Sequence, residues 1–462
     1  MNIWINKNIN DAPINERNET CIFNINSTTG GTVFSSIKEI WLRLGSRHIN
    51  PIYEDFFMIG LAVFAVDKRI SRAKTRDRWT RDLKIFIPIL KCEIWDSVKS
   101  ELETTLNFLT GDHWELIFRP TTERYADERM SSRKNLSIQG CNGVSLFSGG
   151  LDSFCGALRL LEDGNSICFV GHNEYPQLGR IQSGFIDAFQ LQYPEQVVRF
   201  MEFTAGSRAP QFGDEIIRTM ENTSRSRSLL FISAAVSIAG LLDDDIPVFI
   251  PENGFIGINV PLTSSRMGTC STRTTHPYYI KQLNSILRSV GINNKIENFF
   301  AYNSKREIVQ SVNNNPLFRE FAGQTISCSH PCLPRWNQHG DRTYPKNCGY
   351  CYPCLIRKSS LHDINVEIDE YVEPNSLSIE FIESNLRDKP NDVKAIIRSI
   401  YRFRKNDDSE LARLISCTGP LEMEEIDRFL QVYRSTIQDL INIIDSDAML
   451  DYVGVKNNEQ TD

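Results

Sequence analysis

One short stretch of sequence, GVSLFSGGLDS at residues 143–153, decides the fold. Its first five residues form an apolar run that predicts a buried strand, and Phe154–Leu161 just after it has the spacing of a helix. Gly149 and Gly150 allow the backbone to turn tightly between the two. A turn of this kind lies at the carboxyl end of a strand, which is where ligands bind in α/β sheets.

Strands and helices continue to alternate outward from this stretch, over residues 139–325. Apolar runs predict three more strands, at 166–171, 197–203 and 246–251. The intervening helices are predicted at Arg180–Phe189 and Leu229–Leu242. Strands separated by helices of this length predict βαβ units and a parallel sheet covered on both faces.

The turn also carries groups that suit an anionic ligand. Backbone N–H groups after two glycines form a concave nest at the start of a helix, where the helix dipole favours negative charge. The side chains add two hydroxyl donors, from Ser148 and Ser153, and a carboxylate, from Asp152, that can hold Mg²⁺. We therefore expect nucleotide phosphates to bind Ser148, Gly149, Gly150, Asp152 and Ser153, with both serines and Asp152 in the catalytic machinery.

A simple glycine turn between a strand and a helix is the alternative interpretation. Two related phosphate-binding patterns are absent, since the chain has neither a Gly-Lys dipeptide nor a Gly-x-Gly sequence. The first is needed for a Walker A loop and the second for a dinucleotide fingerprint. The turn thus favours neither γ-phosphoryl transfer nor NAD binding.

Cysteine is unevenly distributed along the chain. Five of the 12 cysteines fall within one short segment: Cys328, Cys332, Cys348, Cys351 and Cys354. The overlapping Cys-x-x-Cys pairs at the end of this segment can place three thiolates around one ion, and Cys328 or Cys332 can supply the fourth. Zn²⁺ prefers tetrahedral sulfur coordination, and a closed shell of four sulfurs predicts a structural metal.

Other interpretations of the cysteine segment stay open at this point. His330 or His339 can replace one sulfur, and the segment could instead hold an iron–sulfur cluster or a redox pair. Free thiols are the plain alternative. The remaining seven cysteines are scattered singly, which is typical of small buried residues in a reducing compartment.

Arg227 and Glu252 also lie where ligands are expected. Arg227 begins the apolar helix, from which a guanidinium can reach a phosphate or a carboxylate with two hydrogen bonds. Glu252 follows the fourth strand and can accept hydrogen bonds from a guanine-like base. A solvated arginine and a plain Asn253-Gly254 turn are the alternatives. His172 follows the second strand, where an adenine or a ribose would lie.

The segment at residues 271–277, STRTTHP, is rich in hydroxyls and carries Arg273 and His276. Such a loop suits an anionic substrate, so we expect both residues to bind substrate. A polar surface loop that caps the helix beginning near Pro277 is an equally simple interpretation.

The N-terminal region has its own mixture of strands and helices. Leu83–Leu90 and Trp114–Phe118 predict strands, and Pro88 places the first near an edge or a bulge. Trp95–Leu109 predicts a helix, and Asp55–Val66 predicts a buried helix, although its valines also permit a strand. Residues 121–135 are polar and predict a linker.

The chain is thereby divided into four regions. They are an N-terminal α+β domain (1–138), an α/β nucleotide-binding domain (139–325), a four-cysteine zinc segment (326–362) and a helical C-terminal region (363–462).

Composition narrows the function classes. The formal net charge is −7, which gives no overall attraction to nucleic acid or to an anionic membrane. The longest apolar stretch, around Ile59–Val66, is far too short to span a bilayer, and the first residues lack a secretion-signal pattern. We expect a cytoplasmic protein without membrane or direct nucleic-acid partners.

The turn Ser148-Gly149-Gly150-Leu151-Asp152-Ser153 resembles the PP-loop of the N-type ATP pyrophosphatases, which split ATP into AMP and pyrophosphate while adenylating a substrate oxygen. Within that group the chain resembles QueC, the 7-cyano-7-deazaguanine synthase family. QueC carries a Ser-Cys followed by Cys-Gly-x-Cys-x-x-Cys, which Ser327-Cys328 and Cys348–Cys354 match. Ser226–Ser233 is similar to its Arg-Asn-x-x-Phe-Leu-Ser segment, with Ser228 in place of the asparagine.

The resemblance to QueC covers about residues 139–362. The additional N-terminal domain, together with Glu252-Asn253-Gly254 and the 271–277 loop, is similar to the QatC-type QueC-like proteins of bacterial anti-phage defence systems. The resemblance implies a PP-loop fold of the adenine nucleotide α-hydrolase-like class, with ATP, Mg²⁺ and Zn²⁺ as cofactors. It also implies binding of ATP by Arg227 and favours zinc coordination by Cys328, Cys348, Cys351 and Cys354.

For the activity, the resemblance implies an ATP-dependent, ligase-like enzyme. It would adenylate a 7-deazaguanine carboxylate, release pyrophosphate, and transfer the acyl group to ammonia or to a partner protein encoded in the same defence operon. Two alternatives are a tRNA-modifying PP-loop enzyme and a non-enzymatic scaffold of a defence complex in which the nucleotide only stabilises the assembly.

Overall fold

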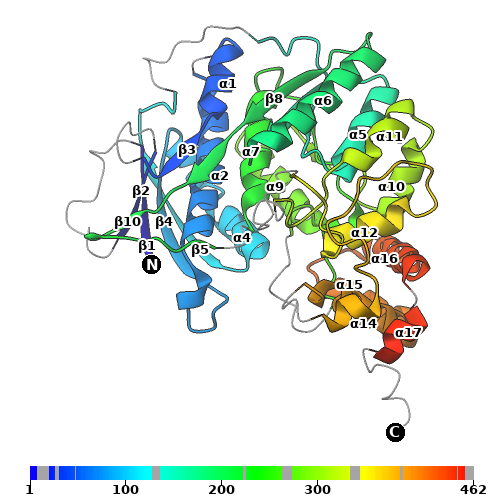
Figure 1. Ribbon diagram of the computed structural model, residues 1–462. Coiled ribbons are helices and arrows are strands. Elements are labelled where there is room, and N and C mark those ends of the chain that lie inside the picture. The colour runs from blue at the N-terminus through cyan, green and yellow to red at the C-terminus, as the bar shows by residue number, and fades with distance from the viewer. Residues whose placement is uncertain are drawn as a thin grey trace.

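The protein is an α/β structure whose described residues form two large sheets and one two-stranded sheet, as a computed structural model shows (Figure 1). The structure describes residues 1–7, 20–25, 31–46, 48–126, 136–221, 225–262, 273–332, 344–384, 389–444 and 446–452. Ser271, Thr272, His339 and residues 127–135 of the predicted linker lie outside these residues. No helix in the described part of the chain is both long and apolar enough to cross a membrane.

The second region forms a five-stranded sheet with the order β13-β12-β6-β7-β8, in which every neighbouring pair is parallel. Its strands are β6 (Gly143–Leu146), β7 (Ile167–His172), β8 (Arg199–Phe203), β12 (Val248–Phe249) and β13 (Ile296–Glu297). The predicted parallel α/β sheet is confirmed. The fourth strand is shorter than its apolar run suggests.

Helices cover both faces of this sheet. On β7, Ile167 and Phe169 belong to one hydrophobic core, and Cys168 and Val170 belong to another, because successive residues of a strand point to opposite faces. The first core includes α5 (Leu151–Glu162), α6 (Pro176–Gln192), α10 (Lys305–Val312) and α11 (Pro316–Phe321). The second includes α7 (Arg227–Ala239) and α9 (Pro277–Ser289).

The N-terminal region forms a six-stranded sheet with the order β11-β10-β2-β1-β4-β5. The four strands β1 (Asn2–Asn6), β2 (Thr20–Asn24), β4 (Asp82–Ile89) and β5 (His113–Pro120) are parallel. The two others, β10 (Gln211–Phe212) and β11 (Glu215–Ile216), are antiparallel and come from the second region. A second contact of this kind pairs β3 (Val33–Ser35) with β9 (Ala205–Ser207).

Helix α2 (Pro51–Arg69) joins the two sheets. All residues from Tyr53 to Asp67 are buried, because one side packs on the N-terminal sheet and the other on α7 (Figure 1). Gly60 lies directly against Ser233 and the Leu229 carbonyl of α7, so a side chain there would force the helices apart. The predicted buried helix is confirmed and the alternative strand is wrong. One hydrophobic core therefore runs across the predicted boundary at residue 138.

Two local predictions in this region are wrong. The helix expected over 95–109 is divided into α3 (Cys92–Asp96) and α4 (Lys99–Thr110), since the Ser97 hydroxyl donates to the Ile94 carbonyl at 2.7 Å and competes with the helix. Strand β4 is not an edge strand, since β1 and β5 flank it. Pro88 is tolerated because the described pairing with β1 ends at Phe86.

The C-terminal region is helical, as predicted. It comprises α13 (Ile379–Glu383), α14 (Asn391–Lys405), α15 (Asp408–Ser416), α16 (Met423–Ile443) and α17 (Ser446–Tyr452). These helices pack around α8 (Gly254–Ile258), α12 (Tyr352–Leu361) and the cysteine segment in a third hydrophobic core. In Figure 1 they lie at the lower right, away from the N-terminal sheet at the left.

Candidate active site and metal centre

The β6–α5 turn and the segment after β12 meet at one point of the five-stranded sheet. The chain runs from β6 to β7 and β8 on one side of the sheet, and it later returns to β12 and β13 on the other side. The strand order therefore reverses between β6 and β12. The crevice outside the carboxyl ends of two such strands is where open α/β sheets bind ligands.

The β6–α5 turn is held by its own serines. Gly149 has a φ of 79°, in the left-handed region that favours glycine. The Ser148 hydroxyl accepts a hydrogen bond from the Gly150 N–H at 3.2 Å and lies 3.1 Å from the Ser153 hydroxyl. Ser153 in turn donates to the Gly150 carbonyl at 3.0 Å. The two hydroxyls thus lie on the same side of the turn, at the N-terminus of α5.

Asp152 carries the only carboxylate of this turn, and two side chains from distant segments approach it. The Asn253 amide donates to Asp152 Oδ2 at 2.7 Å. The Lys305 ammonium lies 3.3 Å from Asp152 Oδ1, which is buried and accepts no hydrogen bond in the described structure. Both partners of the ion pair are largely buried, with side-chain exposures of 6% for Lys305 and 14% for Asp152.

Lys305 was not predicted from the sequence, and Asn253 was predicted only as part of a turn. A cue for Lys305 existed, since it occupies the first position of α10, behind the Ser304–Glu307 capping box. A cation at a helix N-terminus is electrostatically unfavourable unless an anion lies nearby. Asp152 is that anion.

A cavity of about 200 Å³ opens beside the turn. Ser148, Ser153, Arg227 and Glu252, four of the residues predicted from sequence to bind a ligand, line it together with apolar side chains. His172 lines it as well. The structure therefore brings these five residues to one place.

Two of the lining residues, His172 and Arg227, contact the same aromatic ring. The His172 and Phe231 ring centroids are 4.9 Å apart, and the Arg227 guanidinium lies 5.0 Å from the Phe231 ring centroid. Burial and the nearby Arg227 charge lower the pKa of His172 to about 4, so the imidazole is neutral at pH 7. Arg227 Nη2 contacts Glu174 Oε2 at 2.7 Å, and both side chains are about half exposed.

Glu252 lies on the β12 side of the cavity. The Thr275 hydroxyl donates to Glu252 Oε2, and the Asn298 amide donates to the Glu252 carbonyl at 2.8 Å. Burial raises the pKa of Glu252 to about 7, and the Asp152 charge adds to the effect, although the Thr275 hydrogen bond and Lys305 oppose it. The carboxyl group is thus close to its titration midpoint at neutral pH.

Arg273 and His276 do not reach this cavity. Arg273 Nη1 donates to the Phe108 carbonyl at 2.8 Å, and its guanidinium lies over the Phe108 ring. His276 is fully buried, where Nδ1 accepts from the Tyr278 N–H at 3.2 Å and Nε2 lies 3.2 Å from the Thr418 hydroxyl. The assignment of both to substrate binding therefore lacks support, because a helix of the N-terminal region covers this part of the loop.

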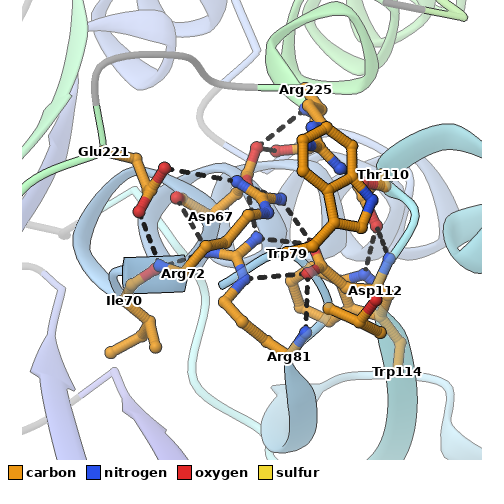
Figure 2. Close-up of polar contacts among 12 residues, drawn as sticks. Asp67, Ile70, Arg72, Trp79, Arg81, Thr110, Asp112, Trp114, Glu221 and Arg225 are labelled. Carbon is orange, nitrogen blue, oxygen red and sulfur yellow. Dashed lines mark hydrogen bonds and ion pairs between the residues drawn. The ribbon is translucent and has the colours of Figure 1, made fainter. Parts of the chain in front are cut away.

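The start of α7, which carries Arg227, is fixed by a buried charge network (Figure 2). The Ser226 N–H and hydroxyl both donate to Asp67 Oδ2 at 2.9 Å. Asp67 Oδ1 accepts from Arg81 Nη2 at 2.6 Å and from Arg72 Nη2 at 2.9 Å, and both arginines also contact Asp112. The N-terminal region thereby sets the position of α7 beside the cavity.

The predicted metal ligands come together in a second site. The sulfur atoms of Cys328, Cys348, Cys351 and Cys354 all lie within 4.8 Å of one another. Two of the separations, Cys328–Cys351 and Cys348–Cys354, are 3.9 Å. A tetrahedron with zinc–sulfur bonds of about 2.3 Å has sulfur–sulfur edges of about 3.8 Å. The four cysteines can therefore hold a metal ion such as zinc.

Hydrogen bonds from the backbone support this site. The N–H groups of His330 and Cys348 approach the Cys328 sulfur at 3.2 and 3.3 Å, and the Cys351 N–H approaches the Cys348 sulfur at 3.3 Å. Such bonds stabilise thiolates and orient metal ligands. The group of four sulfur atoms found among the described residues includes Cys328 but neither Cys332 nor His330. Cys328 is therefore the fourth candidate ligand.

No protein-family model matches this sequence, and no curated protein is similar to it.

Proposed function

We propose that the chain is a QueC-like, ATP-dependent enzyme that adenylates a 7-deazaguanine carboxylate and releases pyrophosphate. The observation that carries the proposal is the convergence of Ser148, Ser153, Arg227 and Glu252 on one cavity at the strand-order reversal, although Gly149, Gly150 and Asp152 of the same turn do not line it. The serines, Arg227 and Glu252 come from different segments. Their meeting at the edge where parallel sheets bind ligands supports a site for a nucleotide and a second small molecule.

The phosphates are the first part of the proposal. The Ser148 and Ser153 hydroxyls and the N-terminus of α5 would bind the β- and γ-phosphates, which become pyrophosphate. Lys305 supplies a buried positive charge next to the turn, and the sequence has no Walker lysine to do so. Preorganised donors and charges of this kind stabilise the charge that develops on a leaving group.

The metal contributions are the second part. Bound Mg²⁺ would shield phosphate oxygens, and Asp152 Oδ1, which accepts no hydrogen bond among the described residues and is paired only with the Lys305 charge, would be its donor. Bound zinc would hold the cysteine segment in its fold, since four thiolates fill its coordination shell. The chain's own residues carry every other role in the proposed reaction.

The third part is the substrate. Glu252 would accept hydrogen bonds from the amino and ring N–H groups of the deazaguanine, because the residue lines the cavity and, among the described residues, only Thr275 donates a hydrogen bond to its carboxyl group. His172 would contact the adenosine moiety, since its buried Nδ1 has no hydrogen-bond partner in the described structure and its ring lines the same cavity. Arg227 would contact ATP at the cavity mouth.

In the proposed reaction a carboxylate oxygen attacks the α-phosphorus of ATP. The new oxygen–phosphorus bond forms as the bond to the pyrophosphate oxygen breaks, and the electron pair leaves with pyrophosphate. An amine nitrogen then attacks the acyl carbon of the adenylate, AMP departs, and the nitrogen loses a proton. The acceptor would be ammonia or an amine of a partner protein that is encoded in the same defence operon. Both proteins would act in the cytoplasm.

The tRNA-thiolation alternative receives less support, because it requires a reactive cysteine near the turn. Cys155 is fully buried, and burial raises the pKa of its thiol well above the usual range. A buried thiol with a raised pKa is a poor nucleophile.

Turnover of Mg-ATP with 7-carboxy-7-deazaguanine tests the proposal. We expect the purified protein to form AMP and pyrophosphate in equal amounts, and Asp152→Asn to lose this activity while it stays folded. Asp163→Asn, at the exposed end of the same helix, is the matched control and keeps full activity. Release of ADP, or unchanged turnover by Asp152→Asn, would contradict the assignment.

A further inference from the structure

The backbone between Thr325 and Cys328 connects the two sites directly. The Ile326 N–H donates to the Gly149 carbonyl at 3.0 Å, so this segment runs along the β6–α5 turn. The next residue, Ser327, accepts a hydrogen bond from the Leu151 N–H at 3.1 Å through its hydroxyl. Cys328, which follows, is a candidate metal ligand. The N-terminus of α5 and the metal centre are therefore linked by one residue.

A second residue beside a metal ligand fixes this connection. The Asn347 side chain accepts from the Ser327 N–H at 3.0 Å and donates to the Thr325 carbonyl at 3.0 Å. Its neighbour Cys348 donates its N–H to the Cys328 sulfur at 3.3 Å. Ser327 directly precedes Cys328, and Asn347, which holds it, directly precedes Cys348, so the position of Ser327 is tied to two candidate ligands.

The Ser327 hydroxyl also lies close to the Ser148 hydroxyl at the turn. A Cβ atom placed on Gly150 would lie 3.3 Å from the Ser148 hydroxyl and 3.5 Å from the Ser327 hydroxyl, so both surround the same backbone position. Ser327 uses an oxygen lone pair to accept from Leu151, and no described residue accepts its hydroxyl hydrogen. That hydrogen can therefore be donated to an anion. When an N–H donates to a hydroxyl and the hydroxyl donates to an anion, each hydrogen bond strengthens the other.

We infer that Ser327 is a phosphate-positioning residue supplied by the metal centre, so that nucleotide affinity and metal retention depend on each other. This inference rests on the proposed function, because it takes the ligand of the turn to be a nucleotide phosphate. Metal bound at the four cysteines fixes Ser327 against Leu151, and phosphate bound at the turn fixes the same segment from the other side. Coupling between two binding sites is reciprocal, so each ligand tightens the other by the same factor.

Binding measurements without turnover test the coupling. Mg-ATP and pyrophosphate are titrated separately into the zinc-loaded protein by calorimetry, for the wild type, Ser327→Ala, Ser327→Thr and Ser329→Ala. We expect Ser327→Ala to weaken binding about tenfold, within the usual range of coupling between sites, with zinc content unchanged. Ser327→Thr keeps the hydroxyl and should bind like the wild type. Ser329 directly follows Cys328 in sequence and is exposed, so its alanine variant is the matched control.

The reciprocal measurement is the zinc affinity, determined at equilibrium by competition with a coloured chelator. Saturating Mg-ATP should raise this affinity about tenfold in the wild type and leave that of Ser327→Ala unchanged. If ATP binds the wild type but neither effect appears, the coupling is wrong and the proposed function stands. If the wild type binds neither ATP nor pyrophosphate, both are wrong.

Discussion

The Lys305 ammonium lies 3.3 Å from Asp152 Oδ1, in an ion pair that joins the start of α10 to the start of α5. Because both side chains are largely buried, removal of either charge would leave the other without a partner and poorly solvated. This pair places a positive charge at the turn that we propose to bind phosphate. It also makes the stability of the site depend on both residues together.

The first prediction concerns this pair. Lys305→Met should lower the free energy of unfolding by about 3 kcal/mol or more, because it leaves the Asp152 carboxylate buried and uncompensated. Adding Asp152→Asn should restore most of that loss, since no charge then remains. Urea unfolding of the single and double variants measures this, and neither should release pyrophosphate. A double variant less stable than Lys305→Met would contradict the explanation.

The second prediction concerns the pH dependence contributed by Glu252. Its folded pKa, about 7, lies above its ordinary value of 4.5, so the folded protein holds this proton more tightly than the unfolded chain. The stability that the Glu252 carboxyl group contributes is fully present below its ordinary pKa of 4.5. It is lost as the pH rises through about 7. The wild type should therefore lose up to about 3 kcal/mol relative to Glu252→Gln between these two pH values.

Chemical unfolding of both proteins at several pH values measures that difference, and Glu195→Gln, an exposed position, is the control that should show none. The ionised carboxylate is the better acceptor, so binding of 7-carboxy-7-deazaguanine should strengthen as the pH rises through about 7. Glu252→Gln should bind it weakly at every pH. A constant stability difference would show that Glu252 does not titrate in this range.

The third prediction concerns the metal. Elemental analysis should find one zinc ion per chain, and Cys351→Ser should lose it together with several kcal/mol of stability, because binding of a structural metal is coupled to folding. Cys332→Ser should retain both, since Cys332 lies outside the four-sulfur group. A metal-free and stable wild type would refute the site, and iron with visible absorbance would indicate a cluster.

The fourth prediction concerns the charge network beside α7. Burial alone would raise the pKa of Asp67, but Arg81 and Arg72 outweigh it, so the pKa is lower than usual. This carboxylate therefore contributes stability above its ordinary pKa, and the contribution is lost as the pH falls through the lowered folded value. Asp67→Asn should cost about 3–5 kcal/mol at pH 7, because two buried arginines lose a partner.

Urea unfolding at pH 7 measures this cost, and Asp82→Asn, whose side chain is 87% exposed, should change it by less than about 0.5 kcal/mol. Asp67→Asn should also weaken ATP binding if the N-terminal region positions Arg227 through Ser226. An unfolding free energy within about 0.5 kcal/mol of the wild type would rule out a structural role for the network.

Much of the fold and part of the site could be predicted because the signals are local. The Ser148–Ser153 turn and the three closely spaced cysteines each lie in one short segment, so spacing alone suffices. Lys305 could not be found in this way, since only the sheet topology brings α10 to α5. Strands β10 and β11 could not be predicted either, because each has two residues and is too short to show an alternating pattern. They join the sheet formed by the first strands of the chain, which are distant in sequence.

The placement of Arg273 and His276 away from the cavity has a common physical origin. Residues 271–277 are polar in composition, but composition does not show which way a side chain points, and Phe108 from the N-terminal region turns Arg273 away from the cavity. His276 has the chemistry of a ligand and is used instead as a buried helix cap. Both depend on contacts between segments that are distant in sequence.

The last prediction concerns the acceptor. The N-terminal sheet and the C-terminal helices lie outside the part that resembles QueC, and transfer to ammonia alone requires no docking surface. A protein acceptor needs one, of roughly 800 Å² on each partner. We therefore expect proteins encoded beside this chain to bind it, and one of them to gain the mass of the deazaguanine acyl group. Intact-mass spectra after coexpression measure this gain, which Asp152→Asn should abolish and Asp163→Asn should preserve. A free amide, or the nitrile formed from it by loss of water, with every partner unmodified would instead establish ammonia as the acceptor.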